Sequence, residues 1–394
     1  MLGLSVFCSA PFNGFYQGLD GKISVCCQAP VLVDHKNNYN EAVHDPKIVK
    51  LRQDFLNGNL PEECKMCTPR VRQETTILCG SKDRSQVTAD YYEPVFLDLL
   101  WSNKCNFACM GCSPRISSGM LKYKTAVDIV DPLNEQSANY KWDSKDEQQR
   151  RIDYILQNIK TIKGIHLNGG EPLMQEGFYD LLERLIELDA THIGIWSHTN
   201  GSVSTYKGKN IADLIKPFDV CTEGHKEDEH VFGCKSHIVM SHDGIGKQGE
   251  YVRYGLNQDI WLKNYNNFYE SGIRTDVQVC YNIFNCLKLE EMADWYEEHL
   301  HVTPNLSLWN WPPAYSAKYI RRIPKLYDSA MNILETHGKR FRKSEYVLDF
   351  MKGAVEDEEL KDMHYKFSES ISKFDALRGT DFETTFPELR ELYY

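Results

Sequence analysis

The chain has 394 residues, enough for one large domain with an appendage or for two domains, and 42% of them are hydrophobic, as in folded globular proteins. Its formal net charge of −11 argues against a protein that binds nucleic acid along the phosphates, because that requires a basic surface. No apolar run approaches the roughly 18 residues of a membrane span, and the N-terminus lacks the features of a secretory signal, so we expect a cytoplasmic protein without a membrane segment.

Cysteine is the residue type that stands out in this composition. The chain has 13 cysteines, an odd number, and in a reducing cytosol clustered cysteines indicate metal or redox chemistry more often than disulfides. Six of them lie in the first 90 residues, at positions 8, 26, 27, 64, 67 and 79.

Local patterns in this front end predict a hairpin followed by a helix. Asp20-Gly21 is a turn signal between two short strand-like runs, and Lys50–Leu56 is a helical pattern that ends at Asn57-Gly58. Farther along, the cysteines at 64 and 67 place two thiolates on a tight turn, which is a recurring metal-binding geometry.

Four of these thiolates could close one metal site, namely those of Cys8, Cys26, Cys64 and Cys67. The sequence does not separate Cys26 from Cys27, and we favour Cys26. A structural zinc ribbon and an iron–sulfur cluster both use four thiolates, so the residues alone suit either metal.

From Tyr91 onward the pattern becomes strand, loop and helix in repetition. Val95–Trp101 is a mostly apolar run typical of a buried strand, and it ends just before a loop that contains Cys105, Cys109 and Cys112. Three thiols are too few for a closed structural zinc site, whereas a cubane cluster held by three cysteines keeps one iron open. A zinc knuckle that lacks its fourth ligand, or cysteines that merely pack in a core, are the alternatives.

This Cys-x3-Cys-x2-Cys loop resembles the cluster loop of the radical S-adenosylmethionine (radical SAM) superfamily. The resemblance implies a [4Fe-4S] cluster whose open iron binds the amino and carboxylate groups of SAM. It further implies reductive cleavage of SAM to a 5′-deoxyadenosyl radical, which abstracts hydrogen from a substrate, and an electron donor such as flavodoxin or ferredoxin.

The second predicted strand, Gly164–Asn168, leads into Gly169-Gly170-Glu171-Pro172. Two glycines let the backbone approach a ligand closely, and a carboxylate accepts hydrogen bonds from an ammonium group. An ordinary strand-to-helix turn with Pro172 at the helix start is the alternative. At this distance from the cysteines the segment resembles the radical SAM motif that holds the amino group of SAM, with Gly169, Gly170 and Glu171 as its members.

Further cofactor contacts are implied after the third and fourth strands, His192–Trp196 and His237–Met240. The resemblance assigns Thr199, Ser241, Asp243 and Arg253 to SAM, although an Asn-Gly turn explains the first equally well. Family loops usually carry an aromatic residue directly before the last cysteine, near adenine. Gly111 stands there in this chain, so adenine contacts must come from elsewhere, such as Phe107 or the fifth strand.

The fold class is therefore expected to be α/β, as a partial (β/α)6 TIM-like barrel with a cysteine-rich N-terminal module and a helical C-terminal segment. The fifth and sixth strands are Asp276–Tyr281 and Asn305–Trp309, and we expect domains at 1–90, 91–315 and 316–394. The predicted helices include Gln148–Lys160, Gly177–Leu188, Leu326–Leu334 and Leu360–Phe374. Two cysteines and two histidines within 221–234 could bind zinc, but a charged surface loop explains them better.

The order of the front-end motifs resembles the SPASM/twitch modules of many radical SAM enzymes, although here the module precedes the barrel. The resemblance implies an auxiliary iron–sulfur cluster on Cys8, Cys26, Cys64 and Cys67, and it favours a peptide or protein side chain as substrate. A nucleotide, a sugar or another small molecule is the alternative substrate. A non-catalytic zinc-binding interaction protein is the alternative of another class.

Overall fold

The computed structural model describes residues 6–18, 21–29, 33, 38–65, 67–80, 84–131, 144–218, 236–309 and 311–394. The loop at 221–234 and Asp20 of the predicted turn lie outside these ranges. The chain divides into two compact units, each built from several segments. The first consists of Met1–Ser102, Tyr140–Ser197 and Thr205–His237, and the second of Asn103–Asn139, His198–Ser204 and Ile238–Tyr394.

The first unit is built on a mostly parallel sheet. Its strands follow the order β6-β5-β3-β1-β2, and β1, β3, β5 and β6 run parallel to one another. Strand β2 is antiparallel to β1, as the predicted hairpin requires. The strands are β1 (Gly14–Gln17), β2 (Ile23–Ser24), β3 (Phe96–Leu100), β5 (Gly164–Asn168) and β6 (Gly194–Thr199), of which β6 ends in the second unit.

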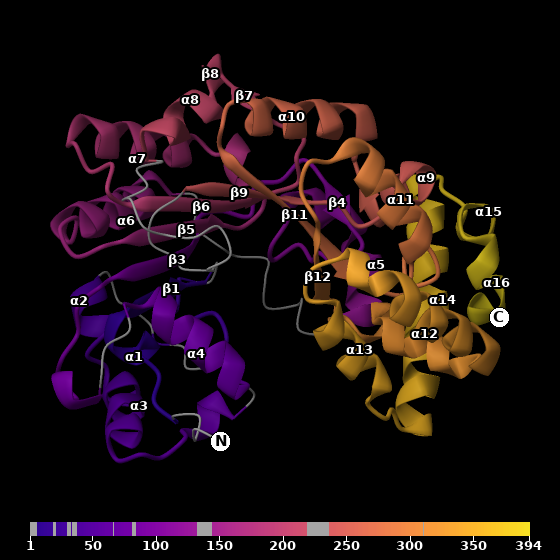
Figure 1. The fold of residues 1–394 in the computed structure, drawn as a ribbon, viewed down its shortest axis with the longest axis horizontal. Helices are drawn as coiled ribbons and strands as arrows, with labels where there is room; N and C mark the ends of the chain where they lie inside the picture. Colours follow the sequence, from indigo (N-terminus) through magenta and orange to yellow (C-terminus); the bar gives the residue numbers. More distant parts are fainter. Residues whose placement is uncertain are drawn as a thin grey trace. The chain divides into compact units, whose positions relative to one another are not determined.

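The pairing of β1 with β3 is a feature that local sequence patterns did not predict. Gly14 lies opposite Phe96 and Gln17 opposite Leu99, so the cysteine-rich front end shares one sheet with the strand that precedes the cysteine loop. Figure 1 shows these strands side by side, with α6 and α7 next to β5 and β6. The larger helices of this unit are α3 (Pro46–Leu56), α4 (Pro69–Leu78), α6 (Lys145–Gln157) and α7 (Glu176–Glu187), and the short ones are α1 (Ala10–Asn13), α2 (Tyr39–Ala42) and α8 (Ile211–Ile215).

Side-chain caps explain where several of these helices begin. Asp45 accepts a hydrogen bond from the backbone of Lys47, Thr68 from Val71 and Ser144 from Glu147. Each cap pairs a backbone N–H that has no partner inside the helix. Helix α3 therefore starts four residues earlier than the apolar pattern alone predicted, at Pro46.

The second unit contains a smaller set of strands, in which β11 and β12 are parallel, and the helices after residue 245. The strand order is β12-β11-β9, with β9 at His237–Ser241, β11 at Arg274–Tyr281 and β12 at Asn305–Leu308. A separate antiparallel pair joins β4 (Ala108–Cys109) to β10 (Arg253–Tyr254). The helices are α5 (Lys124–Val130), α9 (Gly246–Val252), α10 (Gln258–Glu270), α11 (Leu289–His299), α12 (Pro324–His337), α13 (Ser344–Lys352), α14 (Asp357–Arg378), α15 (Phe382–Thr385) and α16 (Arg390–Tyr393).

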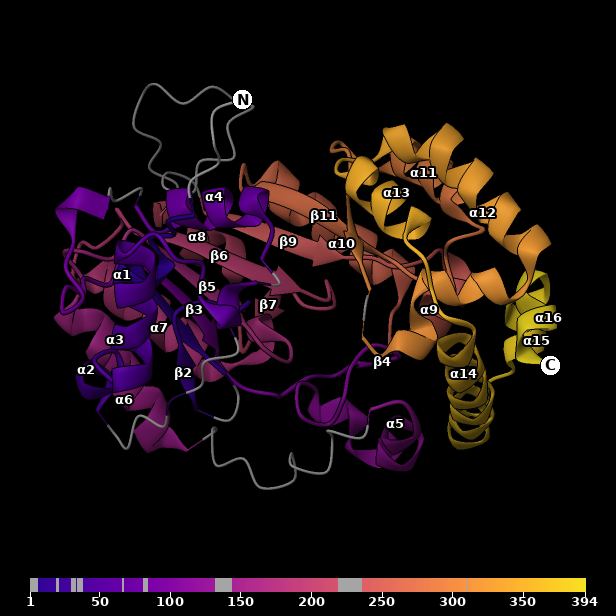
Figure 2. The same ribbon diagram turned by 90° about the horizontal axis from the view of Figure 1, so that it is seen from below.

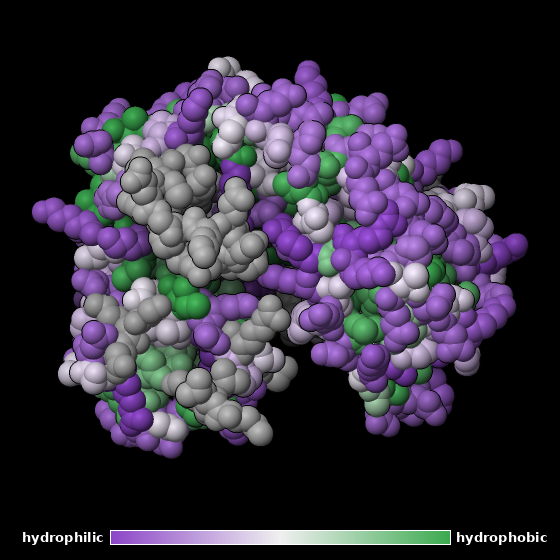
Figure 3. All heavy atoms as spheres, in the orientation of Figure 1, coloured by the Kyte–Doolittle hydropathy of each residue, from purple (hydrophilic) through white to green (hydrophobic). Residues whose placement is uncertain are grey.

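Helix α14 is the long helix of this unit, and it packs against α5 and α16 (Figures 1 and 2). Its buried side chains Phe367 and Phe374 belong to one apolar core with Phe284 and Phe382. The C-terminal helices thus share a core with β11 and β12. On the face drawn in Figure 3, hydrophilic side chains dominate the surface over the C-terminal helices, with scattered hydrophobic residues between them.

The α/β class and all six predicted strands are confirmed. The predicted barrel is not confirmed, because the strands form no closed sheet in the ranges that the structure describes. Within the same ranges, no helix combines the length and the apolar character that a membrane crossing requires.

Candidate functional site

The cysteine loop is folded as a tight turn beside the β4–β10 pair. The backbone N–H of Cys112 donates to the carbonyl of Cys109 at 3.0 Å. The Cys105 sulfur lies 3.4 Å from the backbone nitrogen of Phe107 and 3.8 Å from Nδ2 of Asn200. Donors of this kind stabilise a thiolate that ligates a metal or cluster.

The thiols of Cys109 and Cys112 lie within hydrogen-bond reach of each other. A hydrogen bond from Cys112 lowers the pKa of Cys109 to about 7 against the effect of burial, and the charges of Arg253 and Arg378 act in the same direction. The same hydrogen bond, followed by burial, raises the pKa of Cys112 well above its usual value. A buried pair of thiols of which one loses its proton more readily than an ordinary cysteine fits the ligand set of a metal cluster.

Arg253 and Asp243 are brought to this loop by strand pairing. Arg253 lies directly opposite Cys109 in the β4–β10 register, and its Nη1 lies 2.7 Å from Oδ2 of Asp243. The other carboxylate oxygen accepts the backbone N–H of Cys280 at 2.7 Å. Burial acts to lower the pKa of Arg253, but the charges of Cys109 and Asp243 outweigh it, so the net shift is upward.

Thr199 and Ser241 lie in the second unit with the loop. Thr199 Oγ1 accepts the backbone N–H of Gly201 at 3.1 Å, as the turn interpretation predicts. The Ser241 carbonyl accepts the indole N–H of Trp261 at 3.2 Å. Asn200, which the sequence analysis missed, donates to Asn106 at 2.9 Å as well as facing Cys105.

The space beside Gly111 is filled by a residue from the end of β12. A Cβ atom on Gly111 would lie 2.1 Å from Cζ2 of Trp309, so no other residue fits unless the indole moves. Trp309 is 8% exposed, and its Nε1 has no hydrogen-bond partner among the described residues. Phe107, in contrast, is a core residue packed against Gly255.

The segment Gly169-Gly170-Glu171 belongs to the first unit. Both glycines have positive φ, at 89° and 50°, and a Cβ on Gly169 would lie 2.7 Å from the carbonyl oxygen of Ser102. Glu171 is fully buried, and its Oε1 accepts the N–H of Leu173 at 3.1 Å as the cap of the short 3-10 helix Pro172–Met174. Glu171 and Pro172 therefore form the strand-to-helix turn that the alternative interpretation predicted.

Four of the front-end cysteines line one pocket in the first unit: Cys8, Cys26, Cys64 and Cys67. Burial raises the pKa of each of these thiols, to about 12 for Cys26 and Cys64. Cys27 is not among the lining residues. Arg72, which donates to the carbonyl of Cys67, also lines the pocket and brings a buried positive charge.

These four cysteines line the pocket, but their side chains are not arranged as a site for a single metal ion. In the described ranges, no three Cys, His, Asp or Glu side chains are arranged around a single metal ion. Zinc at 2.3 Å from each sulfur needs such convergence, whereas the cysteines of a cluster ligate different iron atoms and stand farther apart.

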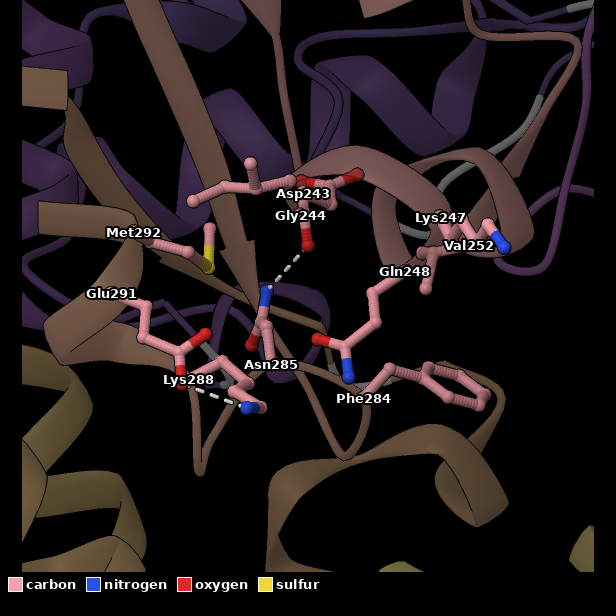
Figure 4. A pocket seen from close by; sticks show the side chains of 11 residues that line it. Asp243, Gly244, Lys247, Gln248, Val252, Phe284, Asn285, Lys288, Glu291 and Met292 are labelled. Atoms are coloured by element: carbon pink, nitrogen blue, oxygen red, sulfur yellow. Dashed lines mark hydrogen bonds and ion pairs between the residues drawn. The ribbon is translucent and has the colours of Figure 1, made fainter. Parts of the chain in front are cut away.

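A cavity of about 250 Å³ lies next to Asp243 (Figure 4). It opens between the start of α9 and the start of α11, where Lys288 pairs with Glu291 at 2.8 Å. Asn285 donates to the carbonyl of Asp243 at 3.1 Å and so fixes this end of β9. The cavity can take a small polar molecule.

One face of the first sheet carries a polar group that the sequence analysis missed. Oδ1 of Asp98 lies 3.1 Å from both Nδ1 of His166 and Nδ2 of Asn168, and Trp196 stacks on the imidazole at 4.3 Å. The sequence does contain a signal for this group. Parallel buried strands are normally apolar throughout, whereas in these strands polar residues alternate with leucine and isoleucine.

Comparison with known proteins finds a similarity in the central part of the chain. Residues 97–236 match the family described as "4Fe-4S single cluster domain". The match begins in β3 and includes all three cysteines of the loop, and it confirms the predicted iron–sulfur character of this part of the chain. No curated protein matches the chain.

Several solved structures match parts of the chain at low identity and low TM-score. The structure of native anSMEcpe with bound AdoMet has 15% identity and a TM-score of 0.42, over 61% of this chain and 60% of that one. Streptococcus suis SuiB bound to the precursor peptide SuiA has 15% identity and a TM-score of 0.38, over 69% and 53%. The chain thus spans less than two thirds of the length of these proteins.

Proposed function

We propose that this chain is a radical SAM enzyme that abstracts hydrogen from a peptide or protein side chain. The observation that carries the proposal is the loop of Cys105, Cys109 and Cys112, which lies in the iron–sulfur family match and pairs with Arg253 through β4 and β10. When bound, a cluster with an open iron supplies SAM cleavage and a 5′-deoxyadenosyl radical.

The residues of the second unit would hold this cofactor pair. The three thiolates would ligate the cluster, and the buried Arg253 would reach the SAM carboxylate while Asp243 fixes the guanidinium. Thr199 and Ser241 are proposed as further SAM contacts.

Gly169, Gly170 and Glu171 are proposed to take the SAM amino group. Gly169 and Gly170 both have positive φ, a conformation that glycine adopts without strain, so this turn depends on two residues without side chains directly before Glu171. Oε1 of Glu171 accepts a hydrogen bond from the N–H of Leu173, and a carboxylate can accept several hydrogen bonds at once.

The front-end pocket is proposed to hold an auxiliary iron–sulfur cluster on Cys8, Cys26, Cys64 and Cys67. All four line one pocket and Cys27 does not, which supports the preference for Cys26. All the described cysteines are free thiols, as cluster ligation in a reducing, cytoplasmic setting requires. A flavodoxin or ferredoxin would supply the electron.

Anaerobic reconstitution tests this proposal directly. We expect two clusters' worth of iron and sulfide per chain, and 5′-deoxyadenosine when dithionite and SAM are added. Replacing all three loop cysteines by alanine should abolish that product. A colourless protein with bound zinc, or product from the triple variant, would overturn the proposal.

A further inference from the structure

Arg378, the last residue of α14, reaches the cysteine loop from far along the chain. Its Nη2 donates to the carbonyl of Ala108 at 2.6 Å, and its Nη1 lies 3.0 Å from the sulfur of Met110. These two residues flank Cys109, so one guanidinium holds both sides of a proposed cluster ligand.

The Arg378 guanidinium is buried without a carboxylate. The residue is 9% exposed, and in the described ranges it forms no ion pair. The rings of Tyr123, Tyr254 and Phe374 lie against it, with centroids 4.9, 4.8 and 4.3 Å from Cζ. Aromatic faces offset only part of the cost of burying a cation, so a negative charge nearby is expected.

The thiolates of a bound cluster would supply that negative charge. The contacts with Met110 and Ala108 hold the guanidinium on both sides of Cys109, which is one of the proposed ligands. Asp243 pairs with Arg253 at 2.7 Å, so Arg253 divides its charge between this carboxylate and the loop, whereas Arg378 faces the loop without a carboxylate partner of its own among the described residues. One-electron reduction of a cluster on these thiolates would add another negative charge at the same place.

We propose that Arg378 is a positioning residue that holds the cysteine loop, and that its charge favours the reduced state of the cluster bound there. The inference rests on the proposed function, because it requires a cluster on this loop. A single electron enters from an external donor, such as a flavodoxin or dithionite, and no bond forms or breaks. Cluster potentials depend on nearby charge and hydrogen bonds, which are the two effects that Arg378 combines.

The test compares variants that separate charge from shape. Arg378→Gln removes the charge but keeps an amide donor for the Ala108 carbonyl, and Arg378→Lys keeps the charge but loses the planar fork. Lys373→Gln removes the same charge from an exposed position on the same helix and serves as the control.

The readout is the midpoint potential of the SAM-responsive cluster signal, followed by electron paramagnetic resonance in the full-length reconstituted protein. We expect Arg378→Gln to shift the reduction equilibrium about tenfold toward the oxidised state, which is 59 mV for a one-electron couple. Arg378→Lys should recover most of that shift, and the control should stay within about twofold of wild type.

Two results would overturn the inference. Equal potentials in Arg378→Gln and the control would show that the charge does not act on the cluster. Equal shifts in Arg378→Gln and Arg378→Lys would show that Arg378 acts through shape alone. If the wild-type protein gives no SAM-responsive signal, the proposed function itself fails, which is a separate outcome.

Discussion

At the scale of single residues, the space beside Gly111 is filled by the side chain of Trp309, which is far away in the sequence. Because the indole occupies the place where a Cβ atom would stand, Gly111→Ala must push the ring or the loop by more than an ångström. We expect this variant to lose cluster iron on gel filtration after reconstitution, with at most half of the wild-type content at the loop.

Gly194→Ala is the matched control, because its Cβ atom would only meet a carbonyl at 3.6 Å. Its iron content should equal that of the wild type. Full iron retention by Gly111→Ala would show that the loop tolerates displacement of Trp309.

The buried side chain of His242 is expected to make the free energy of unfolding depend on pH. Burial, reinforced by the charge of Arg253, lowers its pKa from 6.5 to about 3, and Nδ1 lies 2.9 Å from the hydroxyl of Tyr296. Since the unfolded chain binds the proton and the folded one does not, stability falls as the pH drops below 6.5. At pH 5 this amounts to about 2 kcal/mol.

Urea unfolding of the apoprotein at pH 7 and pH 5 measures this effect. The change between the two pH values should be about 2 kcal/mol smaller in His242→Asn than in wild type, since asparagine keeps the hydrogen bond to Tyr296 without titrating. An identical pH dependence in both proteins would contradict the assignment.

Several residues of the site could not be read from the sequence, and the reason is sequence separation. The cysteines and glycines were found because spacing within one loop is a local signal. Arg378 and Ala108 lie 270 positions apart, and Asn200 and Cys105 lie 95 apart. Only the folded chain brings such pairs together.

At the scale of elements, Arg52 of α3 joins three segments of the first unit. Its fully buried guanidinium donates to the carbonyls of Pro11, Val43 and Ala89, at 2.7, 2.6 and 3.3 Å. Burial lowers its pKa to about 10, which leaves it charged at neutral pH.

We expect Arg52→Met to destabilise the protein by about 3 kcal/mol, because buried carbonyls lose their partners. Urea unfolding measures this, with Lys50→Met on the exposed side of the same helix as control. A loss below about 1 kcal/mol would show that water replaces the guanidinium.

The strands were predictable and their pairing was not. Apolar runs that alternate with helical patterns identified all six predicted strands, and most of the predicted ends lie within two residues of the observed ones. In contrast, nothing in the short run Gly14–Gln17 indicates that it pairs with β3, since any exposed strand edge can accept a neighbour. Arg253 and Cys109 lie opposite each other because β10 pairs with β4, and this pairing between distant segments could not be predicted either.

At the scale of the whole molecule, the two cysteine sets should load independently. Cys64→Ala with Cys67→Ala removes two proposed ligands from the front-end pocket and leaves the loop at 105–112 untouched. We expect about half of the iron to be lost while SAM cleavage without substrate continues, and turnover of substrate to stop.

Iron, sulfide and zinc analysis of this double variant and the wild type decides the matter. Loss of one zinc with unchanged iron would assign a structural zinc ribbon to the front end. A single cluster in the reconstituted wild type would refute the auxiliary site.

The contact between Arg378 and the Ala108 carbonyl sets an order of events during biosynthesis. A ribosome adds about 5–20 residues per second, so the 270 positions between them take on the order of tens of seconds to make. Throughout that interval the nascent chain displays its loop thiols without the guanidinium that completes the turn. Delivery of iron and sulfide to this loop is therefore expected after translation has passed residue 378, and oxidants would reach these thiols most easily before then.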